Sequence, residues 1–568
     1  MAARFTAYVV ACIVTVTVVA GLLVGAQRDT SGPVDLAIVN GRVYTADGKG
    51  TIAEAVAVQG NKVLRVGTTR DIQRLTRRQT RIVDARGGTV LPGFIDGHTH
   101  FLGGSLALAQ VNLLNAKTLA EIETTIRAWA EANAGRPWVI GRGWYYEPFP
   151  GGLPTRQILD AVVPDRPAYL TAYDGHTGWA NSAALELAGV TRDTPDPRNG
   201  VVVKDRRGEP TGVLKEAAMS LVSRHLPQPT RDEQLAALRA GIAEARRFGV
   251  TSVQNASGNA EEFELYDELR RRGELGVRVY AAISAGANVT TADLDRFDAL
   301  RAKYPDDPAF KTGMVKLVAD GVIESHTAAM LAPYANRDEK GDPRFDVESL
   351  HRIVAELDRR GWQIMIHAIG DGAIRMALDA LERASRSNPA PERGRRHRIE
   401  HIETTDPADI PRFGRLGVIA SMQPYHGVPT PNQIVVWSGN IGPERASRGW
   451  AYNSIRKAGG RLAFGSDWPV VTINPLLGLH VAVHRTAPDG TPEGGWYPDE
   501  RVPLEAALDA YTRDAAWASF DEHRKGSIEP DMLADLVVLS TDILARPDAI
   551  ADASVQVTVF DGKIVYER

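Results

Sequence analysis

Cysteine is almost missing from this sequence, whose 568 residues include only Cys12. A single cysteine cannot form an intrachain disulfide, and it excludes a cysteine-based metal site. Basic residues are not in excess either, because 66 Lys and Arg stand against 70 Asp and Glu, a net charge of −4. This balance argues against a nucleic-acid partner, which needs a basic face. The mean hydropathy of −0.21 excludes a polytopic membrane protein.

Charge is also missing from one stretch near the N-terminus, between Arg4 and Arg28. Residues 5–26 are mostly Val, Ala, Ile and Leu, and a membrane-spanning helix needs ~20 such residues. Val24, Gly25 and Ala26 resemble the small-residue cleavage site of a signal peptide. We therefore expect residues 1–33 to be a signal peptide or a signal-anchor followed by a linker. Either would place the rest of the chain outside the cytoplasm, as a periplasmic, extracellular or membrane-anchored protein.

Short runs of β-forming residues dominate both ends of the remaining chain. They occupy residues 35–44 and 55–67 near one end and 534–539, 555–559 and 563–566 near the other. Asn-Gly and Gly-Asn pairs between the first runs are typical of hairpin turns. These features predict one small β domain assembled from residues 34–90 and 522–568.

The middle of the chain, residues 91–521, alternates short apolar runs with helical stretches such as 233–248 and 347–360. This alternation predicts βαβ units and a parallel sheet. About eight such units favour a (β/α)8 TIM-type barrel, with a doubly wound sheet as the alternative. Residues from about 103 to 230 are too long and irregular for one crossover connection, so we expect an insertion there. The expected strands are 90–95, 168–171, 250–254, 277–283, 314–318, 363–366, 398–400, 418–422 and 461–464.

Chemically active residues follow several of these runs. His98 and His100 come after the run 91–97, His367 and His401 end two others, and Asp467 follows a fourth. Residues i and i+2 at an extended strand end point the same way, so the His-x-His pair can bind one metal ion. The carboxyl ends of barrel strands carry the active site. One such histidine is often only a hydrogen-bonded surface residue, but five residues at four strand ends predict a metal site for Zn²⁺, Mn²⁺, Fe²⁺ or Co²⁺.

Six segments occur in a fixed order along the chain: LPGFIDGHTH at 91–100, DGHTGWANSAAL at 174–185, VKLVADG at 315–321, HAIGD at 367–371, RIEH at 398–401 and GSDWP at 465–469. This ordered set resembles the metal-dependent amidohydrolase superfamily, in the branch that includes N-substituted formamide deformylase and the YtcJ-like proteins. The similarity covers roughly residues 34–568, and it implies a TIM-type barrel with a composite β-sandwich domain formed by both ends of the chain.

The resemblance also implies a ligand that the residue pattern alone does not indicate. It places a CO2-derived carbamate on Lys316, bridging two metal ions, where the alternative is a lysine closing a strand in a salt bridge. It implies one or two divalent ions, zinc first and Mn, Fe or Co otherwise, held by His98, His100 and Asp467 and by His367 and His401. A metal-activated hydroxide would then attack a carbonyl carbon, with Asp467 passing the proton to the departing amine.

The resemblance places a second group of residues near the substrate pocket. These candidates for substrate binding are Asp174, His176, Trp179, Asn181 and Glu216. The alternative for the first four is a local turn in which Asn181 caps a helix that starts at Ser182.

These observations together predict an exported hydrolase of non-peptide C–N bonds, acting on a formamide, an N-acyl amine or a cyclic amide. The alternatives are a lactone or ester hydrolase on the same metal site, or a non-catalytic binding protein that retains the fold. The presence of every expected ligand argues against the last. The expected partner is a small-molecule substrate, with a single-span membrane anchor and a homo-oligomer both left open.

Overall fold

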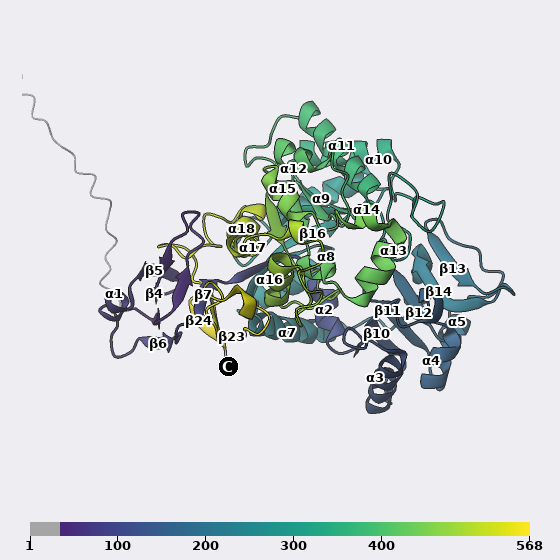
Figure 1. Ribbon diagram of the computed structural model, residues 1–568, viewed down its shortest axis with the longest axis horizontal. Coiled ribbons are helices and arrows are strands. Elements are labelled where there is room, and N and C mark those ends of the chain that lie inside the picture. Colours follow the sequence, from purple (N-terminus) through teal and green to yellow (C-terminus); the bar gives the residue numbers. More distant parts are fainter. Residues whose placement is uncertain (1–33) are drawn as a thin grey trace, which may run out of the picture.

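The computed structural model describes residues 34–568, which form three parts along the longest axis of the molecule. Sheets from the two ends of the chain lie at one side, a barrel lies in the middle, and a third sheet lies at the other side (Figure 1). The predicted hydrophobic segment at residues 5–26 lies outside the described residues. Within residues 34–568, no helix is both long and apolar enough to cross a bilayer.

The central part is a nearly closed barrel of eight parallel strands that follow one another in chain order. The first and last strands meet through a parallel bridge between Thr99 and Trp468. The prediction of a TIM-type barrel is therefore confirmed, and the doubly wound alternative is wrong. The strands are β8 (Phe94–Thr99), β15 (Val250–Asn255), β16 (Arg278–Ser284), β17 (Phe310–Val318), β18 (Gln363–Ala368), β19 (Arg398–His401), β20 (Ile419–Met422) and β21 (Leu462–Phe464).

Helices cover the outside of this barrel (Figure 1). In α10, the buried residues Leu350, Ile353, Val354 and Leu357 follow the i, i+3, i+4, i+7 spacing of an amphipathic helix. The longer helices around the barrel are α7 (Arg231–Arg247), α8 (Ala260–Arg271), α9 (Thr291–Lys303), α10 (Val347–Arg359), α11 (Asp371–Ser387) and α16 (Pro475–His484); shorter ones are α2 (Phe101–Ala107), α12 (Ile410–Leu416), α15 (Tyr452–Lys457), α17 (Leu504–Ala510) and α18 (Arg513–Ala518).

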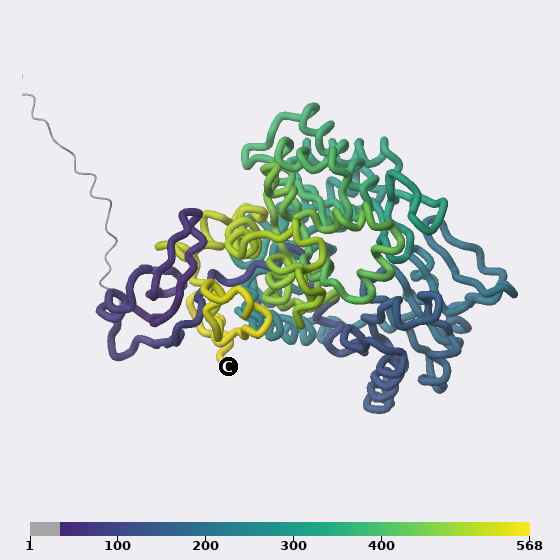
Figure 2. The backbone as a smooth tube through the Cα atoms, viewed as in Figure 1, coloured from purple at the N-terminus to yellow at the C-terminus, as the bar shows by residue number. Residues whose placement is uncertain are grey.

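Both ends of the chain contribute to one six-stranded sheet, in the order β24-β23-β22-β7-β2-β3. Figure 2 shows the two ends, purple and yellow, side by side. A four-stranded sheet, β5-β4-β1-β6, shares a buried apolar cluster with it. The strands are β1 (Leu36–Val39), β2 (Arg42–Tyr44), β3 (Ile52–Ala53), β4 (Ala55–Gln59), β5 (Lys62–Gly67), β6 (Arg81–Asp84), β7 (Thr89–Pro92), β22 (Leu536–Leu539), β23 (Val555–Phe560) and β24 (Lys563–Glu567).

Gly93 is the point at which the chain leaves this sheet and enters the barrel. It separates β7 from β8, and a Cβ atom on it would lie 2.3 Å from the hydroxyl oxygen of Thr251 in β15. Only glycine fits so close to a neighbouring strand, so the local sequence sets how tightly the two parts join.

The insertion forms a sheet of its own, which the sequence did not predict beyond one expected strand. Its order is β13-β14-β12-β11-β10-β9, parallel on one side and antiparallel on the other. Several of its residues line a cavity together with residues of the barrel. Its elements are β9 (Val111–Asn112), α3 (Leu119–Ala132), β10 (Val139–Trp144), α4 (Arg156–Val162), β11 (Ala168–Ala172), β12 (Thr177–Ala180), α5 (Ser182–Leu187), β13 (Gly200–Lys204) and β14 (Pro210–Glu216).

Candidate metal centre and substrate cavity

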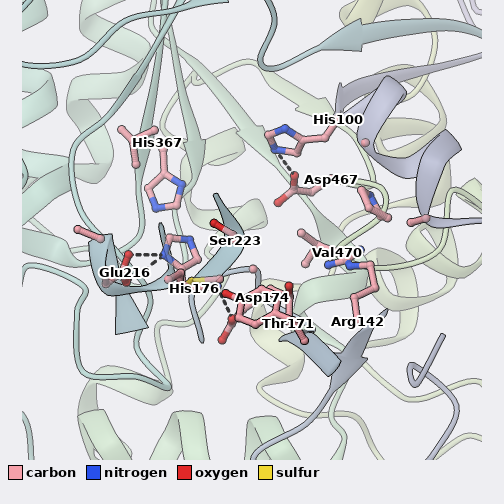
Figure 3. Close-up of a pocket in the computed structure, with 18 of the residues that line it drawn as sticks. His100, Arg142, Thr171, Asp174, His176, Glu216, Ser223, His367, Asp467 and Val470 are labelled. Carbon is pink, nitrogen blue, oxygen red and sulfur yellow. Dashed lines mark hydrogen bonds and ion pairs between the residues drawn. The ribbon is translucent and has the colours of Figure 1, made fainter. Parts of the chain in front are cut away.

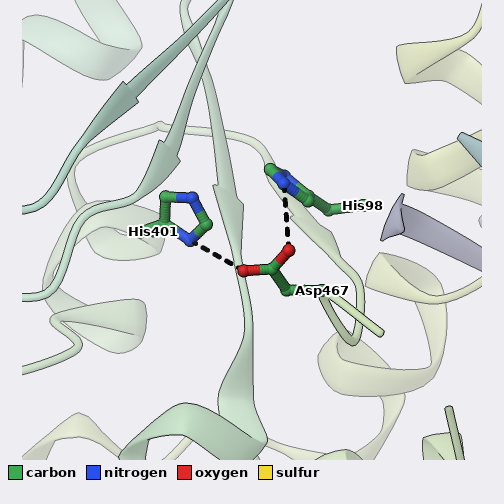
Figure 4. A group of neighbouring side chains, drawn as sticks. All are labelled: His98, His401 and Asp467. Atoms are coloured by element: carbon green, nitrogen blue, oxygen red, sulfur yellow. Dashed lines mark ion pairs between the residues drawn. The ribbon is translucent and has the colours of Figure 1, made fainter. Parts of the chain in front are cut away.

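The six predicted metal ligands all lie at the carboxyl ends of barrel strands. Because the strands are parallel, these ends open at one mouth of the barrel. Figure 4 shows three of the side chains, His98, His401 and Asp467, pointing toward one another. His98 is in β8, Lys316 in β17, His367 in β18 and His401 in β19, while His100 and Asp467 follow β8 and β21.

Closure of the barrel brings Asp467 to His98. The amide N–H of Asp467 donates to the carbonyl oxygen of His98 at 2.6 Å. Asp96 holds the same two segments together, because its carboxylate accepts from the amide of His98 at 3.1 Å and from the amide and hydroxyl of Ser466 at 2.8 and 2.5 Å. The first and last strands therefore meet where both carry a candidate ligand.

The donor atoms of three side chains lie within 4.8 Å of one another, one each from His98, His401 and Asp467. The Asp467 carboxylate lies 3.4 Å from His98 Nε2, 3.1 Å from His100 Nε2 and 3.9 Å from His401 Nδ1. His401 Nδ1 is buried and has no hydrogen-bond partner among residues 34–568. A buried nitrogen with an unused lone pair beside a carboxylate and two more imidazoles is the donor set of a divalent transition metal.

Outer hydrogen bonds orient two of these imidazoles. His98 Nδ1 lies 2.5 Å from the carboxylate of Glu400, and His100 Nδ1 lies 2.7 Å from the hydroxyl of Ser257. Arg398 in turn donates to Glu400 at 2.6 and 3.1 Å, and both side chains are completely buried. A carboxylate behind a histidine fixes the ring and makes it a better ligand, with Nε2 directed to the metal.

Sequence reasoning missed Glu400 and Arg398, although a signal was present. Charged residues at alternate positions of a buried four-residue strand point to the same face, here the barrel interior. His426 was missed as well. It follows β20, and its buried Nε2 has no hydrogen-bond partner in the described chain and lies 3.8 Å from Asp467.

Burial favours the neutral form of three imidazoles, those of His98, His367 and His401. It lowers the pKa of His98 well below its ordinary value, and the nearby Lys316 amine adds to the effect. Burial together with neighbouring imidazoles does the same for the pKa of His367 and of His401. A neutral imidazole is the form that binds a metal ion.

Lys316 is buried inside this group of side chains. Its Nζ lies 3.3 Å from His98 Nε2, and it forms no ion pair with any residue in the range 34–568. Burial lowers the pKa of the Lys316 amine. The alternative of a strand-closing salt bridge is therefore wrong for the described part of the chain.

His367 lies beside His401, with ring centroids 4.5 Å apart. Its Nε2 is 3.2 Å from the carbonyl oxygen of Gly321. The other ring nitrogen, Nδ1, therefore does not face this carbonyl group. The neighbouring carboxylate of Asp320 accepts three backbone N–H groups, from Ala329, Ile369 and Gly370. Asp320 thus holds together the loops that follow β17 and β18.

A cavity of about 820 Å³ opens next to this centre, and three predicted substrate-binding residues line it (Figure 3). All three, Asp174, His176 and Glu216, belong to the insertion sheet or its turns. The amide of His176 donates to Asp174 at 2.8 Å, and His176 Nδ1 lies 3.0 Å from Glu216. Arg344 also forms an ion pair with Glu216.

The structure does not bring Trp179 and Asn181 to the cavity. Trp179 is fully buried in an aromatic cluster, and its Nε1 donates to the carbonyl oxygen of Thr155 at 2.9 Å. The Asn181 side chain accepts from the amides of Ala168 at 2.9 Å and Ala184 at 3.0 Å, and the second bond caps α5. Both side chains hold the insertion together, so the expectation that they bind substrate is corrected to a structural role.

Comparisons with known proteins show which family the chain resembles over its length. The sequence profile of the amidohydrolase family matches residues 81–566. Protein LONG AFTER FAR-RED 3 of Arabidopsis thaliana is 32% identical over 94% of this chain and 91% of its own, and the putative amidohydrolase YtcJ of Bacillus subtilis is 30% identical over 93% and 98%. N-substituted formamide deformylase of Arthrobacter pascens is 28% identical over 94% and 98%. An uncharacterized metal-dependent hydrolase from Pyrococcus horikoshii has a similar structure, with a TM-score of 0.71 and 25% identity over 90% of this chain and 99% of that one.

Proposed function

Because this chain belongs to the amidohydrolase family, in its YtcJ-like branch, we propose that it is an exported, metal-dependent hydrolase of non-peptide C–N bonds. The substrates we propose are formamides, N-acyl amines or cyclic amides. The observation that carries the proposal is the set of buried donor atoms of His98, His401 and Asp467 within 4.8 Å, with an unpaired nitrogen among them.

Different side chains at the barrel mouth would hold the two metal ions. His98, His100 and Asp467 would hold one divalent metal ion, zinc first, and His367 and His401 would hold a second. A metal ion there would polarise the substrate carbonyl and lower the pKa of a water molecule toward neutrality.

Asp467 would move the proton of the reaction. Its carboxylate would accept a proton from the attacking water and deliver it to the nitrogen of the leaving amine. The water oxygen bonds to the carbonyl carbon, the C–N bond breaks, and the amine leaves protonated. Proton delivery matters because an amine anion is a poor leaving group.

Lys316 would complete the centre as a carbamate. Its burial lowers the pKa of the amine, which raises the fraction of the neutral form that reacts with CO2. The product is an anion, whereas an ammonium next to a dication would be strongly unfavourable. The absence of an ion pair for Lys316 within residues 34–568 supports this assignment.

Metal content tests the proposal directly. The full-length chain, produced with bicarbonate and zinc, is analysed by elemental mass spectrometry beside Lys316→Ala and the exposed control Lys303→Ala. About two ions per chain in the wild type and the control, and fewer in Lys316→Ala, would support the carbamate-bridged centre. One ion in all three would favour a single-metal site without the carbamate, and no bound metal would overturn the mechanism.

Substrate class is tested with matched compounds. Metal-dependent release of amine from N-substituted formamides, N-acyl amines or cyclic amides is expected, and it should disappear on chelation and return with zinc. Hydrolysis of the corresponding esters and lactones alone would favour the alternative activity.

Export is proposed from the uncharged stretch at residues 5–26. Cell fractionation and N-terminal sequencing of the mature chain check this. A chain found in the cytoplasm with its N-terminus intact would contradict it.

A further inference from the structure

Arg142 stands where two cavities meet. It lies in β10 of the insertion sheet and lines both the cavity of about 820 Å³ beside the metal centre and an adjoining cavity of about 620 Å³. In the view of Figure 3, its guanidinium lies by Val470 on the same side as Asp467, across from His176 and Glu216.

The guanidinium of Arg142 has a charge but no acidic partner. Its Nη2 donates to the carbonyl oxygen of Tyr173 at 2.8 Å, while its Nη1 is buried and makes no hydrogen bond within the described part of the chain. It forms no ion pair with any residue between 34 and 568. Burial lowers the pKa of Arg142 to about 10, so the side chain is still cationic at neutral pH.

Fully buried arginines of the described chain show what the half-buried Arg142 lacks. Arg278 and Arg398 each contact a carboxylate at 2.6 Å. Arg485 has no acid either, but its guanidinium lies 5.4 and 5.6 Å from the rings of Tyr452 and Trp496 and does not line the described cavities. Arg142 therefore differs from Arg485 because it lines cavities that a ligand can enter.

The other cationic groups of the larger cavity are already used or lie at its edge. Arg344 is paired with Glu216, and Lys316 belongs to the proposed metal centre. Arg198 is exposed. Taking a charge partly out of water without a partner is costly, and a carboxylate from a ligand would offset that cost.

We propose that Arg142 binds a carboxylate of the substrate, so that the substrates are N-acyl amino acids and related amides with a carboxylate near the bond that is broken. A guanidinium recognises a carboxylate through two parallel hydrogen bonds. Within residues 34–568 this guanidinium makes one hydrogen bond, to Tyr173, so donor capacity remains for a ligand. This inference rests on the proposed function and deepens it. Hydrolysis of such a compound adds water across the C–N bond and yields a carboxylic acid and a free amino acid.

Equilibrium binding of a matched pair of compounds tests the assignment. N-methylsulfonyl-L-phenylalanine and its primary amide have the shape of an N-acyl amino acid, but their sulfonamide bond resists hydrolysis. Both are titrated calorimetrically into the full-length, zinc-loaded wild type, Arg142→Met and the control Arg198→Met. Arg142→Gln replaces the Met variant if the latter does not fold.

The wild type and Arg198→Met are expected to bind the acid about 10- to 100-fold more tightly than the amide. In Arg142→Met this ratio is expected to fall to about one, mainly through weaker binding of the acid. A wild type that binds both compounds equally, or neither at millimolar concentration, would overturn the proposal. A ratio that persists in Arg142→Met would also overturn it, because a group other than Arg142 would then bind the carboxylate.

Turnover separates this inference from the proposed function. N-formyl-L-phenylalanine and its primary amide are supplied to the same three proteins. Arginine-dependent binding of the acid without hydrolysis of either compound would contradict the proposed function and leave the role of Arg142 intact. Hydrolysis of both with equal kcat/KM would support the function and refute the role of Arg142.

Discussion

Replacing Glu400 by glutamine should weaken metal binding without removing any ligand. Glu400 accepts from Arg398 on one oxygen at 2.6 Å, and its other oxygen lies 2.5 Å from His98 Nδ1. Glutamine keeps the shape but offers one oxygen and one NH2 group. Since Arg398 and His98 both donate, one of them must face the NH2 group of the new side chain.

The size of the effect follows from the role of the lost bond. Loss of an outer partner of a metal-binding histidine typically costs 10- to 100-fold in affinity, which is about 1.4 to 2.8 kcal/mol. Arg398 would also lose its counter-charge while fully buried, but it keeps contacts with Gly97, Gln254 and Ser421. We therefore expect a folded protein with weaker zinc binding rather than an unfolded one.

Competition with a chelator of known affinity measures the zinc affinity of the wild type, Glu400→Gln and Glu522→Gln. Glu522→Gln is a matched control, because Glu522 also pairs with an arginine, Arg396, at 2.6 Å. This pair lies at the ends of the barrel strands opposite to the metal centre. Zinc affinity should fall only in Glu400→Gln. If Glu400→Gln binds zinc as tightly as the wild type while His98→Ala does not, the outer hydrogen bond is irrelevant and the reasoning is refuted.

Three further changes test other parts of the structure. Asn181→Ala removes the cap of α5 and should lower the free energy of unfolding by about 1–3 kcal/mol while KM stays unchanged. Denaturation and steady-state kinetics measure the two quantities. A changed KM at full stability would show that Asn181 binds substrate after all. Gly97→Ala would place a Cβ atom 2.7 Å from the carbonyl oxygen of Phe464. We therefore expect the free energy of unfolding to fall by about 1–3 kcal/mol and the bound metal to be lost. A melting temperature equal to that of the wild type would contradict this. Burial raises the pKa of Asp358, but hydrogen bonds led by that from His397 at 2.9 Å outweigh it and lower the pKa below its ordinary value. The stability that Asp358 contributes is thus complete above its unfolded pKa of about 3.9 and is lost as the pH falls further. Asp358→Asn should be about 3 kcal/mol less stable than the wild type at pH 7, and this difference in unfolding free energy should narrow below about pH 4. A difference that widens in acid would show that the predicted pH dependence is wrong.

The barrel strands were predictable because strands of a parallel sheet are buried on both faces. They read as short apolar runs, and the expected runs at 250–254, 363–366 and 398–400 differ from β15, β18 and β19 by only one or two residues. The run expected at 168–171 also forms a strand, β11, but in the insertion sheet rather than the barrel. Local hydrophobicity shows that a strand exists, and it does not show which strand lies beside it.

In the insertion, too, the local sequence does not show which residues reach the site. Asp174 and His176 line the cavity, whereas Trp179 and Asn181, in the same segment, are buried away from it. Asp174 and His176 precede β12, whereas Trp179 lies within this buried strand and Asn181 caps α5. The sequence alone shows only one polar and aromatic segment, and the backbone path separates its members.

The sequence by itself determined the strand-and-helix alternation, the family, and the set of side chains able to bind a metal, because each depends on short-range patterns or on ordered motifs. Only the tertiary structure decided which of these side chains meet. His98 reaches Asp467 because the barrel closes, and Glu400 reaches His98 because β19 faces the barrel interior. Arg142 enters the cavity because the insertion sheet lies against the barrel mouth. Such contacts join residues hundreds of positions apart, and they depend on packing and register, which no local pattern contains.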